Sequence, residues 1–147
     1  MQTIIKCFTI IALVFCAGTV ASADSYFDGK TPLLCSVYQL YECDPPNDCQ
    51  AVTPAEIQGV SHLDIDFKAK TIKRAGVESK QQSVIERVKI GVDGKLIIQG
   101  IENGQEDVRD GAGWTISIMD PEGTMVMATA GDGFAVVGLG ACVPQPK

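Results

Sequence analysis

The chain has 147 residues, of which 46% are hydrophobic, and a formal net charge of −6 at pH 7 from 12 basic and 18 acidic side chains. The length and the hydrophobic content suit one domain with a core of its own. The acidic balance argues against a protein that binds nucleic acid or anionic membrane surfaces, because both recruit clustered cations.

The first 23 residues have the pattern of a secretory signal peptide. One basic residue, Lys6, precedes an apolar run over residues 7–20, and Ala21-Ser22-Ala23 ends it in the A-x-A pattern that a signal peptidase cleaves. The run is shorter than the about 20 apolar residues of a transmembrane helix. We expect cleavage after Ala23, with an uncleaved anchor as the alternative, and a periplasmic or secreted protein.

Cleavage would divide the chain into a signal peptide, residues 1–23, and a single β domain, residues 24–147. Of the 147 residues 124 then remain, and the loss of Lys6 leaves 11 basic against 18 acidic side chains, a net charge of −7. From this charge we expect no nucleic acid among the partners. We also expect no stable membrane insertion after signal cleavage, because no later segment is long and apolar enough to span a bilayer.

Four of the six cysteines lie in the expected domain: Cys35, Cys43, Cys49 and Cys142. An even set in an oxidising compartment predicts two disulfides, for which three pairings exist. The short, proline-containing loop between Cys43 and Cys49 favours a local bridge, which leaves Cys35 with Cys142 and brings the first and last strands together. Zinc is the alternative, but the cysteines lack C-x-x-C spacing and His62 is the sole histidine.

After an extended lead-in over residues 24–32, the domain is dense in β-forming segments separated by Gly-, Pro- and Asp-rich turns, among them the hairpin signal Asp93-Gly94. The predicted strands cover residues 33–43, 63–68, 83–90, 95–100, 114–118, 124–130 and 134–142, and a short one can form at 71–73.

One short helix is predicted after the cysteine loop. Thr53 can cap it, Pro54 fits its first position and Glu56 can reach back to the cap. Gly59 limits this helix to one or two turns.

Seven or eight short strands without crossover helices predict an all-β, mainly antiparallel fold. We expect a small closed or nearly closed meander barrel, because closure between the first and last strands removes two exposed edges. A β-sandwich is the alternative.

The sequence offers little catalytic chemistry. It has no G-x-S-x-G, P-loop or H-E-x-x-H motif, its cysteines are expected to be oxidised, and His62 is expected on the solvent face of a strand. Asp64 and Asp66 are candidates for a carboxylate-based hydrolase, although positions i and i+2 of an exposed strand suit general acid–base work poorly. We therefore predict no catalytic residues and no cofactor.

Three other features are candidate binding elements. Glu106, Asp107 and Asp110 lie in an acidic, glycine-rich loop that could ligate calcium, although the order of an EF-hand loop is absent and a solvated connection explains them better. Trp114, the sole tryptophan, can plug one end of a barrel or stack on a ligand. A basic group could meet an anionic glycan or lipid headgroup, or be solvated; its members are Lys68, Lys70, Lys73, Arg74 and Lys80.

Several segments together resemble a group of small exported proteins of Gram-negative bacteria. They are residues 27–35, 65–70, 107–111, 113–114 and 140–142, so the resemblance spans most of the expected domain. It implies a periplasmic location and agrees with a Cys35–Cys142 bridge, but it brings no established activity and no site residues.

The sequence thus predicts an exported, non-enzymatic β-barrel that binds a small apolar ligand or acts as an interaction module for an envelope protein. A secreted inhibitor of a protease or lysozyme is the first alternative, and a carboxylate-based hydrolase is the second. Whether the barrel interior is packed or hollow separates ligand binding from the other functions.

Overall fold

The computed structural model describes residues 25–45, 48–57, 59–76, 83–102, 104 and 111–145. The predicted signal peptide, the candidate calcium ligands Glu106, Asp107 and Asp110, and Lys80 of the basic group lie outside these residues.

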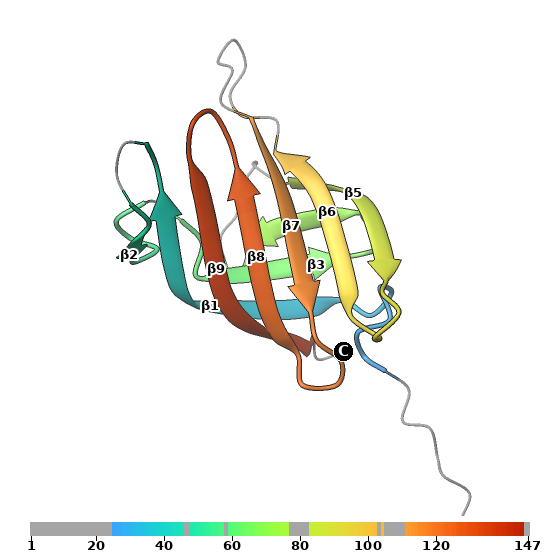
Figure 1. Cartoon of the computed structure of the whole chain (residues 1–147). Coiled ribbons are helices and arrows are strands. Elements are labelled where there is room, and N and C mark those ends of the chain that lie inside the picture. Colours follow the sequence, from blue (N-terminus) through green and yellow to red (C-terminus); the bar gives the residue numbers. More distant parts are fainter. Residues whose placement is uncertain are drawn as a thin grey trace, which may run out of the picture.

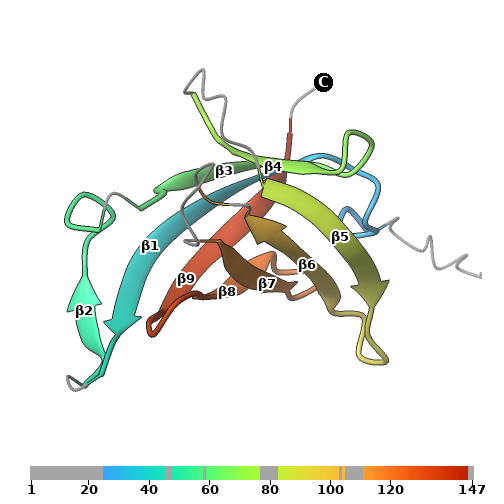
Figure 2. The same ribbon diagram turned by 90° about the horizontal axis from the view of Figure 1, so that it is seen from above.

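The strands form one antiparallel sheet in the order β2-β1-β3-β4-β5-β6-β7-β8-β9, and β1 also pairs with β9 (Figure 1). Eight strands therefore close into a barrel, as the sequence predicts, and β2 is an extra strand beside β1. Figure 2 shows β2 beyond the curved end of β1, away from β3. The strands are β1 (Leu33–Cys43), β2 (Gln50–Val52), β3 (His62–Asp66), β4 (Thr71–Arg74), β5 (Ser83–Ile90), β6 (Leu96–Glu102), β7 (Ala112–Ile118), β8 (Thr124–Ala130) and β9 (Ala135–Pro144).

The pairing of β1 with β9 closes the barrel. It runs from Leu33 opposite Pro144 to Cys43 opposite Ala135, with a bulge between Val37 and Gln39. Alternation along β1 turns Leu33 and Val37 into the core before the bulge, and the extra residue returns Leu40 to the core after it.

Both predicted disulfides are present. Cys35 and Cys142 lie directly opposite each other in the β1–β9 ladder, 4.0 Å apart at Cα, and they are 0% and 2% exposed. Cys43 and Cys49 close the short loop between β1 and β2, where Cys49 is exposed. The first bridge thus ties the two terminal strands inside the core, and the second ties a surface loop.

Two local predictions need correction. The described residues contain no helix: the expected helix at Thr53 is a turn, in which Thr53 and Glu56 still bond each other's main chain as a capping pair does. The Gly59 amide donates to the Pro54 carbonyl at 2.6 Å and closes this turn before a helical ladder can start, because helix nucleation in so short a segment is unfavourable. The short strand β2, next to Cys49, is an addition that the sequence did not predict.

One end of the barrel is densely packed. Phe27, from the lead-in before β1, is 4% exposed and covers this end, and the main-chain amide of Gln145 donates to the Pro32 carbonyl at 2.9 Å, which joins the residue after β9 to the residue before β1. The largest fully buried side chains of the described residues are Leu33, Ile65, Leu96, Ile98, Ile118, Met125 and Cys35.

We predict that the two disulfides differ in their contribution to stability. In the chain-entropy model the loop closed by Cys35–Cys142 contributes about 4.8 kcal/mol, against about 2.4 kcal/mol for the short loop of Cys43–Cys49. The double variant Cys35→Ser/Cys142→Ser should therefore lose several kcal/mol of unfolding free energy in urea, toward the upper part of about 2–5 kcal/mol. Cys43→Ser/Cys49→Ser is the matched control, and an equal or larger loss there would contradict the prediction.

Candidate functional site

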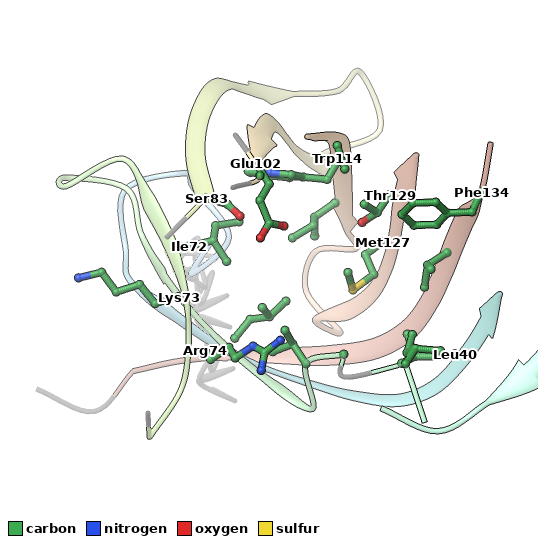
Figure 3. Close-up of a pocket in the computed structure, with 18 residues that line it drawn as sticks. Leu40, Ile72, Lys73, Arg74, Ser83, Glu102, Trp114, Met127, Thr129 and Phe134 are labelled. Carbon is green, nitrogen blue, oxygen red and sulfur yellow. The ribbon is translucent and has the colours of Figure 1, made fainter. Parts of the chain in front are cut away.

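The other end of the barrel is hollow. A cavity of about 340 Å³ opens between the last residues of β4, β6 and β8 and the first residues of β3, β5, β7 and β9 (Figure 3). The turn after β2 contributes Ile57, Gly59 and Val60 to its wall. The aliphatic and sulfur-containing side chains that form its floor are Leu40, Leu63, Ile72, Ile116, Met127 and Val136.

The strand registers explain why the barrel is packed at one end, called the lower end here, and hollow at the other, the upper end. Inward-facing residues form rows across neighbouring strands. The lowest row, Leu96–Ile118–Met125, is fully buried. The next row is Ile98–Ile116–Met127, and the uppermost row that spans four strands is Gly100–Trp114–Thr129–Val136. The cavity is bounded by side chains of these upper two rows and, across the barrel, by Ile72 of β4 and by Ser83, the residue opposite it on β5. Because β4 ends at Arg74, it supplies no further strand residue to fill this space.

Trp114, the residue expected to plug one end of the barrel or stack on a ligand, lies in the cavity wall. Its indole crosses Gly100, where an added Cβ would collide with Cζ2 and Cε2 of the ring and with the Val84 carbonyl oxygen. Gly100 is therefore required for the indole to lie against the wall. The indole Nε1 is buried and has no hydrogen-bond partner among the described residues.

Among the described residues, two oppositely charged side chains are turned toward the cavity at its mouth. Arg74 is opposite the buried Leu63 in the β3–β4 ladder, so it belongs to the inner face, and Glu102 follows Gly100 by two residues on the inner face of β6. Figure 3 shows the guanidinium of Arg74 and the carboxylate of Glu102 turned into the cavity from different walls. The hydroxyl groups of Ser83 and Thr129 complete the polar lining.

The predicted basic group is divided by the fold. Arg74 faces the cavity. Lys73 lies opposite Asp64 in the β3–β4 ladder, on its outer face, and its side chain points away from the cavity in Figure 3. Lys68 and Lys70 lie in the turn at the other end of β4. A single basic patch therefore does not form among the described members of the group.

The candidate acid pair also lies outside the cavity. Asp64 and Asp66 are outward-facing residues of β3; Asp66 is exposed, and Asp64 is half-buried and accepts a hydrogen bond from Nε2 of Gln145 at 3.0 Å. His62, at the start of the same strand, is exposed. The geometry gives no support to catalysis by these groups.

Three carboxyl groups have lowered pKa values, each through local hydrogen bonds. A hydrogen bond from the main-chain amide of Thr31 lowers the pKa of Asp28, and one from the main-chain amide of Thr53 lowers the pKa of Glu56. A hydrogen bond from the Lys95 side chain lowers the pKa of Asp93. None of the three carboxylates belongs to the cavity lining. The shifts therefore reflect turn structure.

No three His, Cys, Asp or Glu side chains in the described part of the chain are grouped so that they could hold a metal ion. Within the same part, no helix has the length and apolar character needed to cross a membrane. The disulfides indicate an oxidising environment outside the cytoplasm.

No family model, no curated protein and no solved structure matches this chain. The functional argument therefore depends on the geometry of the barrel. Sequence reasoning singled out Trp114, but the strands that it predicted, 71–73 and 95–100, stop short of Arg74 and Glu102. A signal was present in the sequence: Gly100 and Glu102 are two residues apart, so a strand that extended to Glu102 had to turn both to one face.

We predict that Gly100→Ala displaces Trp114 and destabilises the barrel by about 3 kcal/mol, the upper range for overpacking a core position. Gly113→Ala, in the neighbouring strand, is the control, because an added Cβ there meets no atom within 4 Å. Urea unfolding and the emission maximum of Trp114 measure both effects. Equal stability of the two variants would show that the close contact between Gly100 and the indole is not required.

Proposed function

We propose that this protein is an exported, non-enzymatic β-barrel, periplasmic or secreted, that binds a small and largely apolar ligand at its open end. The observation that carries the proposal is the contrast between the two ends of one interior. The row at Leu96, Ile118 and Met125 is fully buried, whereas the rows above it border a cavity of about 340 Å³. A barrel that needed its interior for stability alone would be filled at both ends.

The cavity has the size and lining of a small-molecule site. Its volume lies near the lower end of the roughly 300–1,000 Å³ of ligand pockets. At about 30 Å³ for each water-sized group, it has room for roughly eleven non-hydrogen atoms. An aliphatic floor with aromatic groups at Trp114 and Phe134 and a few polar groups at the mouth suits an apolar body with a polar end.

We predict that butylbenzene, an apolar probe of this size, binds with a dissociation constant of the order of 10–100 µM. Trp114 is the sole tryptophan, so its fluorescence reports on the cavity directly. Thr129→Phe, which fills the cavity from its inner face, should weaken binding by at least about tenfold, or 1.4 kcal/mol. Ala128→Phe is the matched control. Ala128 is the residue of β8 that precedes Thr129, and it faces outward, so the same added ring does not enter the cavity.

Equal binding by these two variants would locate the probe outside the cavity. No change in fluorescence and no thermal stabilisation of the wild-type protein by butylbenzene would refute ligand binding at this end.

The outer wall supports a second candidate function, an interaction module for another envelope protein. The strands β7, β8 and β9 carry no charged side chain, although the chain has a net charge of −6, and Val126 and Val143 on their outer faces are 45% and 55% exposed. Contiguous apolar surface of this kind is typical of protein contacts.

For this second function we predict that a photo-reactive side chain in place of Val126 cross-links to another envelope protein. The same group in place of Lys89, on the exposed and charged outer face of β5, is the control. Equal cross-linking at both positions would argue against a specific surface on β7–β9.

A further inference from the structure

The floor of the cavity contains one unbranched side chain, that of Met127, among branched aliphatic ones. Met127 is opposite the buried Ile116 in the β7–β8 ladder and opposite Gly138 in the β8–β9 ladder, so it faces the barrel interior. It is nevertheless only half-buried, and it belongs to the cavity lining. Its accessible surface is therefore turned into the cavity, as Figure 3 shows.

Gly138 determines how far Met127 reaches into this space. A Cβ added at Gly138 would lie 2.6 Å from Cγ and 3.0 Å from Sδ of Met127, so the methionine lies directly on the main chain of β9. A side chain at position 138 would push the thioether toward the centre of the barrel, because a methionine has several rotatable bonds and gives way. The glycine therefore keeps the space above Met127 open.

The same arrangement one row lower leaves no space. Met125 is opposite Gly140, and a Cβ added at this glycine would collide with Cε of Met125, but Met125 is 0% exposed. The interior is thus closed immediately below Met127. An apolar chain that enters from the mouth reaches the level of Met127 and goes no deeper.

We infer that Met127, lying on Gly138, limits the length of the apolar chain that the site takes. This inference rests on the proposed ligand-binding function and narrows its ligand class to apolar chains of up to roughly eleven non-hydrogen atoms, the number that a cavity of about 340 Å³ holds. Longer chains, such as the acyl chains of membrane lipids, leave their excess length outside. The limit is set at the floor, so it does not depend on the chemistry of the mouth.

Straight-chain alcohols from 1-heptanol to 1-tridecanol measure this limit, because they share one neutral polar end and differ only in chain length. Trp114 is the sole tryptophan and lines the cavity, so its fluorescence gives each dissociation constant. In the wild-type protein the affinity should rise about fourfold with each added CH₂ up to 1-decanol, which has eleven non-hydrogen atoms. Beyond 1-decanol it should rise by less than about twofold for each CH₂, because the added groups stay in water.

Substitutions at the floor should move the limit in opposite directions. Met127→Ala removes Cγ, Sδ and Cε, so 1-tridecanol should bind at least about tenfold more tightly than 1-decanol. Gly138→Ala should shorten the limit by about one or two carbons, because the added Cβ pushes Met127 inward. The double variant Gly138→Ala/Met127→Ala should recover a limit of 1-decanol or longer.

Met127→Leu is the matched control. Leucine has as many side-chain non-hydrogen atoms as methionine, so the limit should stay within about one carbon of the wild type. Urea unfolding shows which variants are folded, and either Met127→Ala or Gly138→Ala tests the inference if the other does not fold.

The outcomes separate this inference from the proposed function. If the alcohols bind but the affinity rises without a limit, or if the limit is the same in the wild type and in the folded floor variants, ligand binding stands and the role of Met127 is wrong. If Met127→Leu shifts the limit as far as Met127→Ala does, the shift comes from a loosened core and the inference is overturned. If no alcohol binds, the proposed function fails and this inference fails with it.

Discussion

The long pairing of β1 with β9 is the constraint on which the rest of the structure depends. It engages β1 over its whole length, from Leu33 to Cys43, and the Cys35–Cys142 bridge fixes it inside the core. The opposite edge of β1 is shared: its first residues pair with β3, and its last residues, Leu40 to Glu42, pair with β2. Because β1 leaves β3 and pairs with β2 along this edge, the barrel wall is interrupted between β1 and β3. The turn after β2 lines the cavity at this interruption. The open end thus follows from how the barrel is closed.

The size of the side chains in each row then determines which end is filled. The inner face of β9 has glycine at two successive inward positions, Gly138 and Gly140, where an added Cβ would collide with Met127 and with Met125 respectively. Two flexible methionines thus occupy the space that β9 leaves. At the uppermost row Gly100 is covered by the indole of Trp114, which lies along the wall and does not cross the barrel. The glycines therefore set where the large side chains lie, and the centre of the upper rows stays empty.

Patterns in the sequence were sufficient to predict the eight barrel strands, the all-β class, closure by the first and last strands and both disulfides, although not the extra strand β2. These features depend on alternation, turn residues and cysteine spacing, each of which is local or nearly so. The cavity depends on which inward residues meet across the barrel, and the bulges in β1 and β5 change the facing of residues in a way that alternation alone does not give. Arg74 and Glu102 illustrate this limit: each looked like part of a polar loop, and each is the last inward residue of a strand.

Inward-facing charges also explain the depth of the site. A charged side chain on the inner face is tolerable only where water reaches it, because burial without a partner is costly. Glu102 therefore marks the level at which water enters, and the fully buried Ile98 on the same strand marks the level below which it is excluded. Ile98 and Glu102 are four positions apart, a separation of about 13 Å at roughly 3.3 Å per residue. A ligand of roughly eleven non-hydrogen atoms in extended form fits this interval, so its polar end would come to lie beside the two charges while its body replaces the missing side chains of the upper rows.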